Sequence, residues 1–251
     1  PYELTLDLEE WAPLIHAQQQ VQAQLESRRV ETTTRFLLNV KQKGIFQIPL
    51  DVPDGLEVVR VVGEESAGHQ AALIEKHERV TEPAGRVMVQ LSAEARGPVT
   101  FFVTTTQTIP GAGLVDAEAA PAPITILWPQ LAPAFAQSIK GQVVLTAPDR
   151  LNVVVEGTNQ GNLRSIDPAT AFVSDDSTSQ RFAYEYVVAT GSFDLKASLR
   201  RPRVFVDQVT SVSVESGLLR YLVDLDYDVR FSAVPDFRVD VPAASEARIR
   251  V

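Results

Sequence analysis

The sequence predicts an all-β protein, built as an antiparallel β-sandwich in two lobes that carry an internal repeat; one large supersandwich is the alternative. Apolar residues recur at every second position along most of the chain, which is the period of a strand with one buried face. Turn sequences such as Pro53-Asp-Gly and Pro148-Asp-Arg separate these short segments. In addition, residues 12–62 match residues 201–251 without a gap. Many short strands with regular turns are typical of sandwiches and barrels.

The repeat has a period of 201 − 12 = 189 residues. Identical residues support the match, and so does the agreement of the apolar pattern, in which Phe36 and Leu38 correspond to Leu225 and Tyr227. The identical pairs are Pro13/Pro202, Gln19/Gln208, Glu26/Glu215, Ser27/Ser216, Asp51/Asp240, Val52/Val241, Pro53/Pro242, Glu57/Glu246 and Val62/Val251.

The repeat decides the structure expected for residues 14–25, which are rich in Gln and Ala. Their own composition favours a helix, although apolar and polar residues also alternate there. The matching residues 203–214 are rich in β-branched side chains, which favour a strand. We therefore predict that residues 14–25 form a strand, and that Glu-Ser forms the tip of a hairpin in both copies.

The remaining elements follow from the same alternation. Strands are expected at residues 56–62, 86–91, 99–106, 142–146, 151–156 and 181–188. Short helical turns are expected at Ala71–His77 and Ala132–Ser138. Residues 109–123 are rich in Pro and Ala, which predicts a first lobe at residues 1–112, a linker at 113–123 and a second lobe at 124–251. The terminal copy should then pack onto the sheet formed by residues 124–199. The core of that lobe is predicted to include Val204, Val212, Val214, Leu225, Tyr227, Val229, Phe237 and Val239.

Composition narrows the possible partners. The chain has 251 residues, of which 45% are hydrophobic and 22% are charged, and its net charge is −9. An acidic chain without a basic cluster repels phosphate backbones, so nucleic acid is not expected as a partner. No apolar run approaches the roughly 20 residues of a membrane span, so membrane insertion of these residues is not expected. Cysteine is absent, which fits an extracytoplasmic protein, periplasmic or at the cell surface. The chain begins Pro1-Tyr2-Glu3, so we expect it to be part of a longer protein.

Histidines and carboxylates offer candidate metal sites, each with a simpler interpretation. His69 and His77 flank a short segment and could lie on one side of a helix, but their spacing matches no standard ligand motif, and a solvated loop explains them. His16 is expected to be exposed or packed at an interface. The carboxylates of Asp224, Asp226 and Asp228 share one strand face and could hold calcium. A charged solvent face is the simpler interpretation of these three residues.

Aromatic residues suggest a sugar-binding platform formed by Trp128, Tyr184 and Tyr186, although alternating aromatics in a sandwich are more often core residues. No nucleophile–base motif, phosphate loop or paired-carboxylate motif is present. The sequence therefore assigns no catalytic, cofactor-binding or metal-binding residue, and it predicts no cofactor and no enzymatic activity.

Three phrases resemble repeat modules of large, mostly uncharacterised bacterial extracytoplasmic proteins. These phrases are F-x-I-P-L-x-V-P-x-G-L-E-V-x-x-V at residues 46–61, G-Q-V-V-L-T-A at 141–147 and Y-x-Y-V-V-A-x-G-S-F-D-L at 184–195. The resemblance implies β-sandwich modules in a long ectodomain and carries no site residues with it. The function expected is a non-catalytic structural or interaction module. Its partners would be neighbouring modules of the same polypeptide or another protein. The alternative is a carbohydrate-binding or carbohydrate-active supersandwich domain.

Overall fold

The computed structural model describes residues 12–66, 68–109, 122–155, 163–172, 179–187, 191–231 and 233–241. It is an all-β sandwich, as the sequence predicts, and its only helical element in these ranges is the single 3-10 turn Pro168–Thr170. No helix within these ranges has the length and hydropathy needed to cross a membrane. The strands are β1 (Leu14–Leu25), β2 (Arg29–Asp51), β3 (Leu56–Gly63), β4 (Gln70–Ala71), β5 (Ile74–Arg79), β6 (Arg86–Thr108), β7 (Ala122–Leu127), β8 (Gln130–Leu131), β9 (Ser138–Pro148), β10 (Leu151–Val155), β11 (Arg164–Ile166), β12 (Ser179–Tyr186), β13 (Ser192–Leu199), β14 (Arg203–Glu215) and β15 (Leu218–Arg230).

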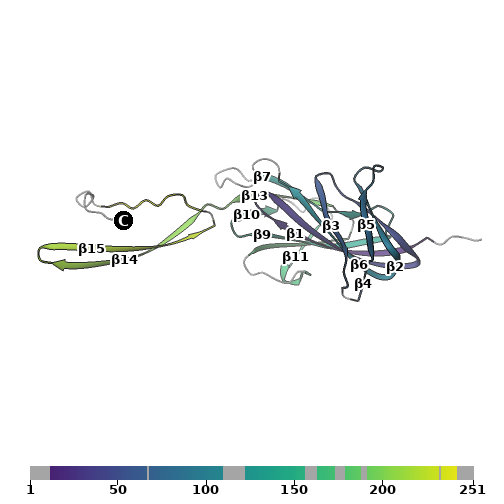
Figure 1. Cartoon of the computed structure of the whole chain (residues 1–251), viewed down its shortest axis with the longest axis horizontal. Helices are drawn as coiled ribbons and strands as arrows, with labels where there is room; N and C mark the ends of the chain where they lie inside the picture. The colour runs from purple at the N-terminus through teal and green to yellow at the C-terminus, as the bar shows by residue number, and fades with distance from the viewer. Residues whose placement is uncertain are drawn as a thin grey trace, which may run out of the picture.

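One large sheet organises the molecule. Its strands lie in the order β11-β12-β9-β1-β2-β6-β3, with β4 and β5 also paired to β6 and β8 paired to β2. A second sheet has the order β10-β13-β7, and β14 and β15 form a third sheet by themselves. Figure 1 shows the first two sheets stacked into the sandwich, while the hairpin of β14 and β15 extends away from it. Most pairs are antiparallel, but β1 runs parallel to β9.

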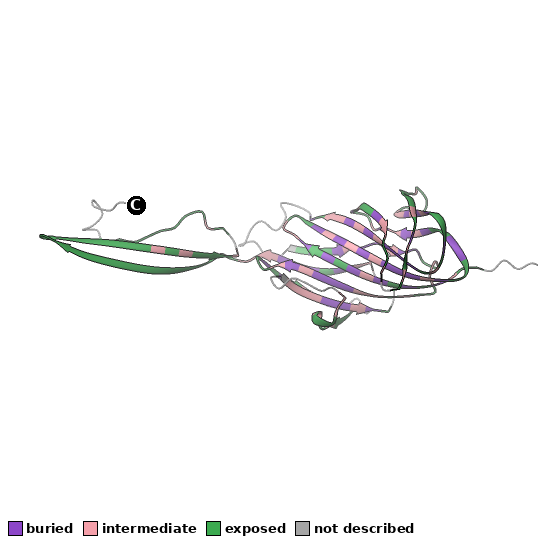
Figure 2. Cartoon of the chain, turned by 60° about the horizontal axis from the view of Figure 1, so that its bottom comes forward, coloured by how far each residue is buried: buried purple, intermediate pink, exposed green. Residues whose placement is uncertain are grey.

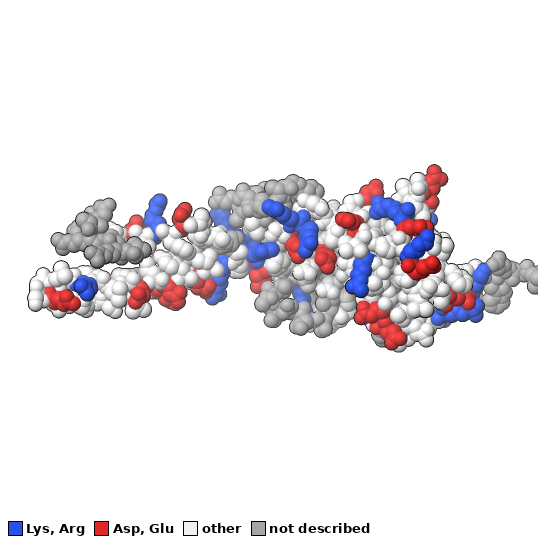
Figure 3. Space-filling model, viewed as in Figure 1, with Lys and Arg blue, Asp and Glu red and all other residues white. Residues whose placement is uncertain are grey.

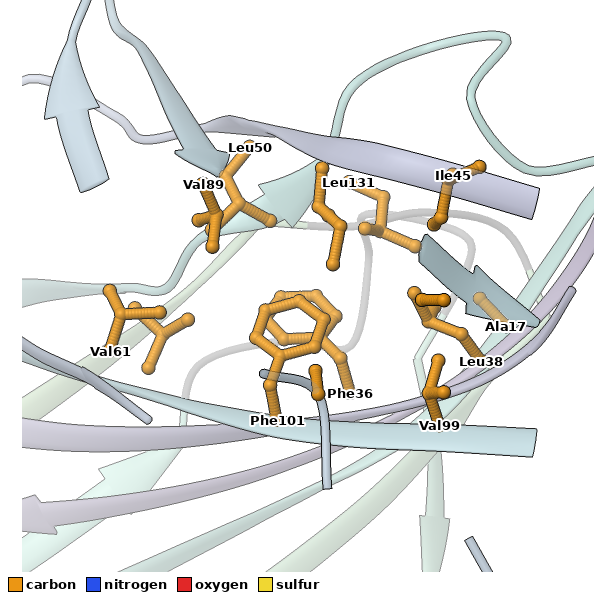
Figure 4. Packing of buried hydrophobic residues seen from close by; sticks show 14 of the residues in the cluster. Ala17, Phe36, Leu38, Ile45, Leu50, Val61, Val89, Val99, Phe101 and Leu131 are labelled. Carbon is orange, nitrogen blue, oxygen red and sulfur yellow. The ribbon is translucent and has the colours of Figure 1, made fainter. Parts of the chain in front are cut away.

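The long strands β2 and β6 line both walls of the first core. Their ladder runs from Arg29 to Val40, shifts register twice before Gln47, and then continues to Asp51. Such bulges bend a strand and increase its twist, so one strand can contribute to two facing layers. Phe36 and Phe101 face each other across the ladder and stack with ring centroids 4.8 Å apart. Figure 4 shows Leu50, Val89 and Leu131 across the core from these two rings.

The second core lies between the large sheet and the three-stranded sheet. Residues on β1 and β9 face β7, β10 and β13 across a core that includes the buried Trp128. Val21, Ala23 and Leu25 of β1 belong to this second core, whereas Ile15 and Ala17 of the same strand belong to the first core. One strand therefore contributes to both cores.

Residues 14–25 form strand β1, which confirms the assignment made from the repeat. The two hairpins also share one register: Leu14 pairs with Lys41 in the first copy, and Arg203 pairs with Arg230 in the second. Each of these four residues lies 189 positions from its counterpart (203 − 14 and 230 − 41). In both copies the Glu-Ser pair lies at the tip of the hairpin.

The backbone after the hairpin begins in the same way in both copies and then diverges. Gln42 and Phe231 occupy equivalent positions, and both have positive φ, 66° and 76°. This conformation is uncommon outside glycine, so the agreement extends the match beyond the paired residues. After this point β2 continues to Asp51, whereas residues 233–241 form no strand. Both copies therefore form the expected hairpin, but residues 233–241 have no counterpart of the strand that β2 continues to Asp51.

The expectation that the terminal copy packs onto residues 124–199 is wrong. Figure 2 shows the β14–β15 hairpin almost entirely exposed, whereas buried residues alternate along the strands of the sandwich. Of the core predicted for the second lobe, Leu225 and Tyr227 are partly buried and the other members are exposed, although the rings of Tyr227 and Phe237 lie 4.3 Å apart. The exposed members are Val204, Val212, Val214, Val229, Phe237 and Val239. Alternation along these strands sets which side chains share a face, but it does not determine what covers that face.

The predicted lobes also need correction, because the two cores share one sheet. β1 hydrogen-bonds to β2 on one side and to β9 on the other, so strands of residues 1–112 and of residues 124–251 are direct neighbours. Most of the predicted linker 113–123 lies outside the described residues. The helix expected at Ala71–His77 is wrong as well, since Ile74–Arg79 form strand β5, which pairs antiparallel with β6. Pairing to β6 overrides the local preference of these residues. Residues 133–137 form turns and bends without a helix, and Ser138 begins β9.

Candidate functional site

A shallow hollow lies on the outer face of the large sheet where β1, β2 and β9 run side by side. Its volume is about 340 Å³, and polar side chains from all three strands line it. His16 on β1 and Ser138 on β9 face each other because the parallel pairing of these strands places them opposite one another. His69 reaches the same hollow from the turn that it forms with Ser66. The remaining lining residues are Ala17, Gln18, Leu37, Asn39 and Lys140.

The hollow brings together two histidines that the sequence did not associate. His16 Nδ1 lies 3.1 Å from Ser138 Oγ, which is hydrogen-bond distance. A serine nucleophile needs a base that is itself oriented by a third group, usually a carboxylate. None of the described residues that line the hollow is a carboxylate. The arrangement can therefore bind a small polar group by hydrogen bonds, but it does not form a nucleophilic triad.

Histidine 77 does not join this group. It lies on β5 opposite Val89, whereas His69 lies in the turn before β4. The helix that could have placed both histidines on one side does not form. Over the part of the chain that the structure describes, no three His, Asp or Glu side chains gather as a metal site would require.

The proposed aromatic platform is part of the core. Trp128 is 0% exposed, Tyr186 2% and Tyr184 7%, so these three rings are not available to a sugar. Phe193 packs against both Trp128 and Tyr184, with ring centroids 6.0 Å apart in each case. The carbohydrate hypothesis therefore loses the residues on which it rested, and the core interpretation of these aromatics is confirmed.

Tyr186 belongs to a buried polar cluster that also contains Gln19, one of the residues identical in the two copies of the repeat (Gln19/Gln208). Its hydroxyl donates to Gln19 Oε1 at 2.5 Å, and Gln19 Nε2 donates to the carbonyl of Pro129 at 2.7 Å. Burial raises the pKa of Tyr186 far above its ordinary value. A buried polar group needs such partners, because leaving it without one costs about 1–3 kcal/mol.

Glycine 141 makes room for this cluster. It is the register partner of Gln19 on β1 and of Tyr186 on β12, so it lies between them in the sheet. A Cβ on Gly141 would collide with the Tyr186 ring and lie 2.6 Å from the backbone oxygen of Gln19. The missing side chain lets the tyrosine ring cross the strand and reach the glutamine, which explains a glycine inside a strand.

The β14–β15 hairpin is amphipathic, and one of its faces is acidic. Asp224, Asp226 and Asp228 are all exposed, and Asp226 lies directly opposite Asp207. Figure 3 shows acidic side chains along the hairpin. Arg230 pairs with Asp228 at 2.6 Å. These aspartates therefore form a charged solvent face, as the simpler interpretation predicted.

The opposite face of the hairpin corresponds to the buried face of β1 and β2. Its side chains are all apolar except for Gln208 and Thr210. They are Val204, Val206, Gln208, Thr210, Val212 and Val214 on β14 and Leu219, Tyr221, Val223, Leu225, Tyr227 and Val229 on β15. Val206 is 47% exposed, and Tyr221 is 63% exposed. We call this set the apolar face of the hairpin. The sequence analysis assigned six of these residues to a core, namely Val204, Val212, Val214, Leu225, Tyr227 and Val229.

Comparisons with known proteins add little to this geometry. No family model matches the chain, and no curated protein matches it. Among solved structures, it is similar to an M1 zinc metallopeptidase from Deinococcus radiodurans, with 9% identity, a TM-score of 0.40, and coverage of 95% of this chain and 52% of that one. It is also similar to the E323A mutant of a two-domain M1 zinc metallopeptidase bound to L-tryptophan, with 10% identity, a TM-score of 0.41, and coverage of 98% and 54%. The chain thus spans about half the length of each of these proteins.

Proposed function

We propose that this chain is a non-catalytic interaction module that binds another protein through the β14–β15 hairpin. The observation that carries the proposal is the exposed apolar face of that hairpin. An isolated two-stranded hairpin is at best marginally stable in water, and contiguous exposed apolar surface is typical of interaction sites.

The edges of the hairpin add to this argument. Within the described residues, β14 pairs only with β15, so each strand keeps one unpaired edge. Unpaired edges accept further strands from a partner, and soluble proteins usually protect them. The acidic face disfavours burial on its own side, because carboxylates lose hydration when they are covered. A partner would therefore bind at the edges and over the apolar face.

The absence of catalysis is part of the same proposal. Its support is the composition of the outer hollow, where His16 and Ser138 meet without a carboxylate among the described lining residues. The hollow is polar and open, and its histidines serve no reaction in this interpretation. Purified protein should then show no hydrolysis of ester, peptide or glycoside substrates that depends on His16.

Site-specific photo-crosslinking tests the binding proposal in cells that make the protein. The photoreactive residue p-benzoylphenylalanine replaces Tyr221, which is on the apolar face and 63% exposed. The matched control places it at Leu222, which is 59% exposed on the opposite face. We expect a discrete protein adduct from position 221 and none from position 222. No adduct at 221, or the same adduct from both positions, would refute the proposal.

A further inference from the structure

The apolar face of the β14–β15 hairpin corresponds, position by position, to a face whose partners are visible in the same molecule. In the first copy, β2 pairs antiparallel with β6, and β1 pairs parallel with β9. All twelve of the matching side chains on β1 and β2 are buried, from Ile15 through Leu25 and from Val30 through Val40 at alternate positions. The second hairpin has the same register and the same type of face but, within the described residues, neither neighbouring strand.

We propose that the β14–β15 hairpin is the opening hairpin of a second sandwich of this design, and that its partner is a β-sandwich lacking an opening hairpin of its own. This inference rests on the proposed function and names the partner class. The partner supplies a β6-like strand antiparallel to β15 and a β9-like strand parallel to β14. Its second layer covers the apolar face, as β7, β10 and β13 cover Val21, Ala23 and Leu25 of β1.

Gln208 makes the proposal specific. It is the counterpart of Gln19, which is buried only because a tyrosine hydroxyl and a backbone carbonyl satisfy it. Gln208 is exposed, and its amide donates to the neighbouring Thr210 at 3.0 Å. Apolar residues surround it on the same face, so its polarity would be costly in a generic apolar contact. The partner should therefore present a hydroxyl and a carbonyl opposite Gln208, with a glycine on its β9-like strand, as Gly141 is placed opposite Gln19.

The outward backbone groups of β15 match those that β2 uses to pair with β6. In the first hairpin the amide of Glu26 donates to the carbonyl of Arg29, so the N–H and C=O groups of Val30 and every second residue after it are directed towards β6. The counterparts on β15 begin at Leu219 and include Val223, and they are the residues of the apolar face. The open edge and the apolar face thus belong to the same residues, as strand addition with side-chain recognition requires.

A copy of β6 serves as the probe. The peptide of residues 97–108, GPVTFFVTTTQT, pairs with Arg29–Val40 in the first copy and should pair with residues 218–229 in the second. A fluorescein-labelled peptide is titrated into the full chain and followed by fluorescence anisotropy. We expect saturable binding to the unchanged protein.

Two variants and a control locate the binding. Val223→Pro removes an outward N–H from an edge strand, where proline is tolerated, and Tyr227→Asp places a charge on the apolar face without removing a backbone donor. Each should weaken peptide binding at least tenfold. Asp226→Asn changes the acidic face and should leave the affinity within twofold. Circular dichroism of all three variants checks that the strands persist.

The remaining outcomes contradict the inference. An unchanged protein that does not bind the peptide lacks the predicted acceptor edge. If the Val223→Pro and Tyr227→Asp variants bind the peptide as tightly as the unchanged protein does, the peptide binds elsewhere, for example at an edge of the large sheet. A chain that self-associates in light scattering, and is made monomeric by Tyr227→Asp, identifies a second copy as the occupant instead. In each case a photo-crosslinked adduct at position 221 would still support binding of a protein by the hairpin. Failure of the strand-addition inference can therefore be distinguished from failure of the proposed function.

Discussion

Replacing the repeated glutamine by alanine in each copy should give opposite results, although the residue is the same. Gln19 is 1% exposed and satisfies both the Tyr186 hydroxyl and the Pro129 carbonyl. Gln208 is exposed at the equivalent position of the second hairpin. We expect Gln19→Ala to destabilise the sandwich strongly and Gln208→Ala to leave its stability nearly unchanged.

The magnitude follows from the two groups that lose their partners. A buried hydroxyl or carbonyl left without a hydrogen bond costs about 1–3 kcal/mol, so two of them give a loss of about 2–6 kcal/mol in the free energy of unfolding. At an exposed site such as Gln208, substitutions usually change stability by less than about 0.5 kcal/mol. Gln22→Ala is a control, because Gln22 lies on the same strand as Gln19 and is exposed.

Urea unfolding followed by tryptophan fluorescence measures the difference, because Trp128 is fully buried in the second core. With a slope of about 2–3 kcal/mol per molar urea, the midpoint of Gln19→Ala should fall by roughly 1–3 M, and those of Gln208→Ala and Gln22→Ala should not move appreciably. Equal losses for Gln19 and Gln208 would mean that the second hairpin is packed. A negligible loss at Gln19 would mean that its buried hydrogen bonds do not contribute.

Three further results are expected. Gly141→Ala should lower the free energy of unfolding by about 1–3 kcal/mol or more, because the new Cβ would collide with the Tyr186 ring. Gly191→Ala is the control and should lower it far less, because the nearest atom to its Cβ is 3.4 Å away. Equal midpoints of the two variants in urea would contradict this reasoning. Stability should fall above pH ~10, by up to about 1.4 kcal/mol per pH unit, since the unfolded chain loses the tyrosine proton that buried Tyr186 retains. Tyr186→Phe should lower that slope, and an unchanged slope between pH 9 and 11 would show that Tyr186 is not its source. Deleting residues 201–251 should change the free energy of unfolding of the sandwich by less than about 0.5 kcal/mol, because β14 and β15 are exposed and, among the described strands, pair only with each other. A larger drop in the thermal unfolding temperature would show that the hairpin supports the sandwich.

Much of the local structure could be predicted from the sequence. The strand at residues 14–25 and the hairpin tips follow from the repeat. The two copies are expected to share one backbone conformation, and residues 203–214 favour a strand more clearly than residues 14–25 do. Alternation correctly grouped the side chains of Val204, Leu225 and Tyr227 on one face and those of the aspartates on the other. The buried roles of Trp128 and Tyr186 also agree with the sequence interpretation of aromatics in a sandwich.

The candidate sites depended on contacts between distant segments. Ser138 faces His16 only because β1 pairs with β9, and His69 reaches the same hollow from the turn after β3. The identity of Gln19 with Gln208 indicated a shared role, but nothing local to either glutamine revealed Tyr186 as its partner, 167 residues away. A side chain's hydrogen-bond partner is set by tertiary packing, which residue types alone do not encode.

The sequence by itself determined most of the long strands, the alternation of their two faces, and the register shared by both hairpins. The tertiary structure alone decided that one sheet runs through both cores and that the second hairpin packs against neither. The physical reason is that polarity alternates perpendicular to the sheet, whereas strands choose their neighbours in its plane through backbone groups that are the same in nearly every residue. Alternation therefore predicts which face of a strand is apolar and should be buried, but not which segment buries it. That segment belongs to another part of the fold or, as we propose for β14 and β15, to a partner.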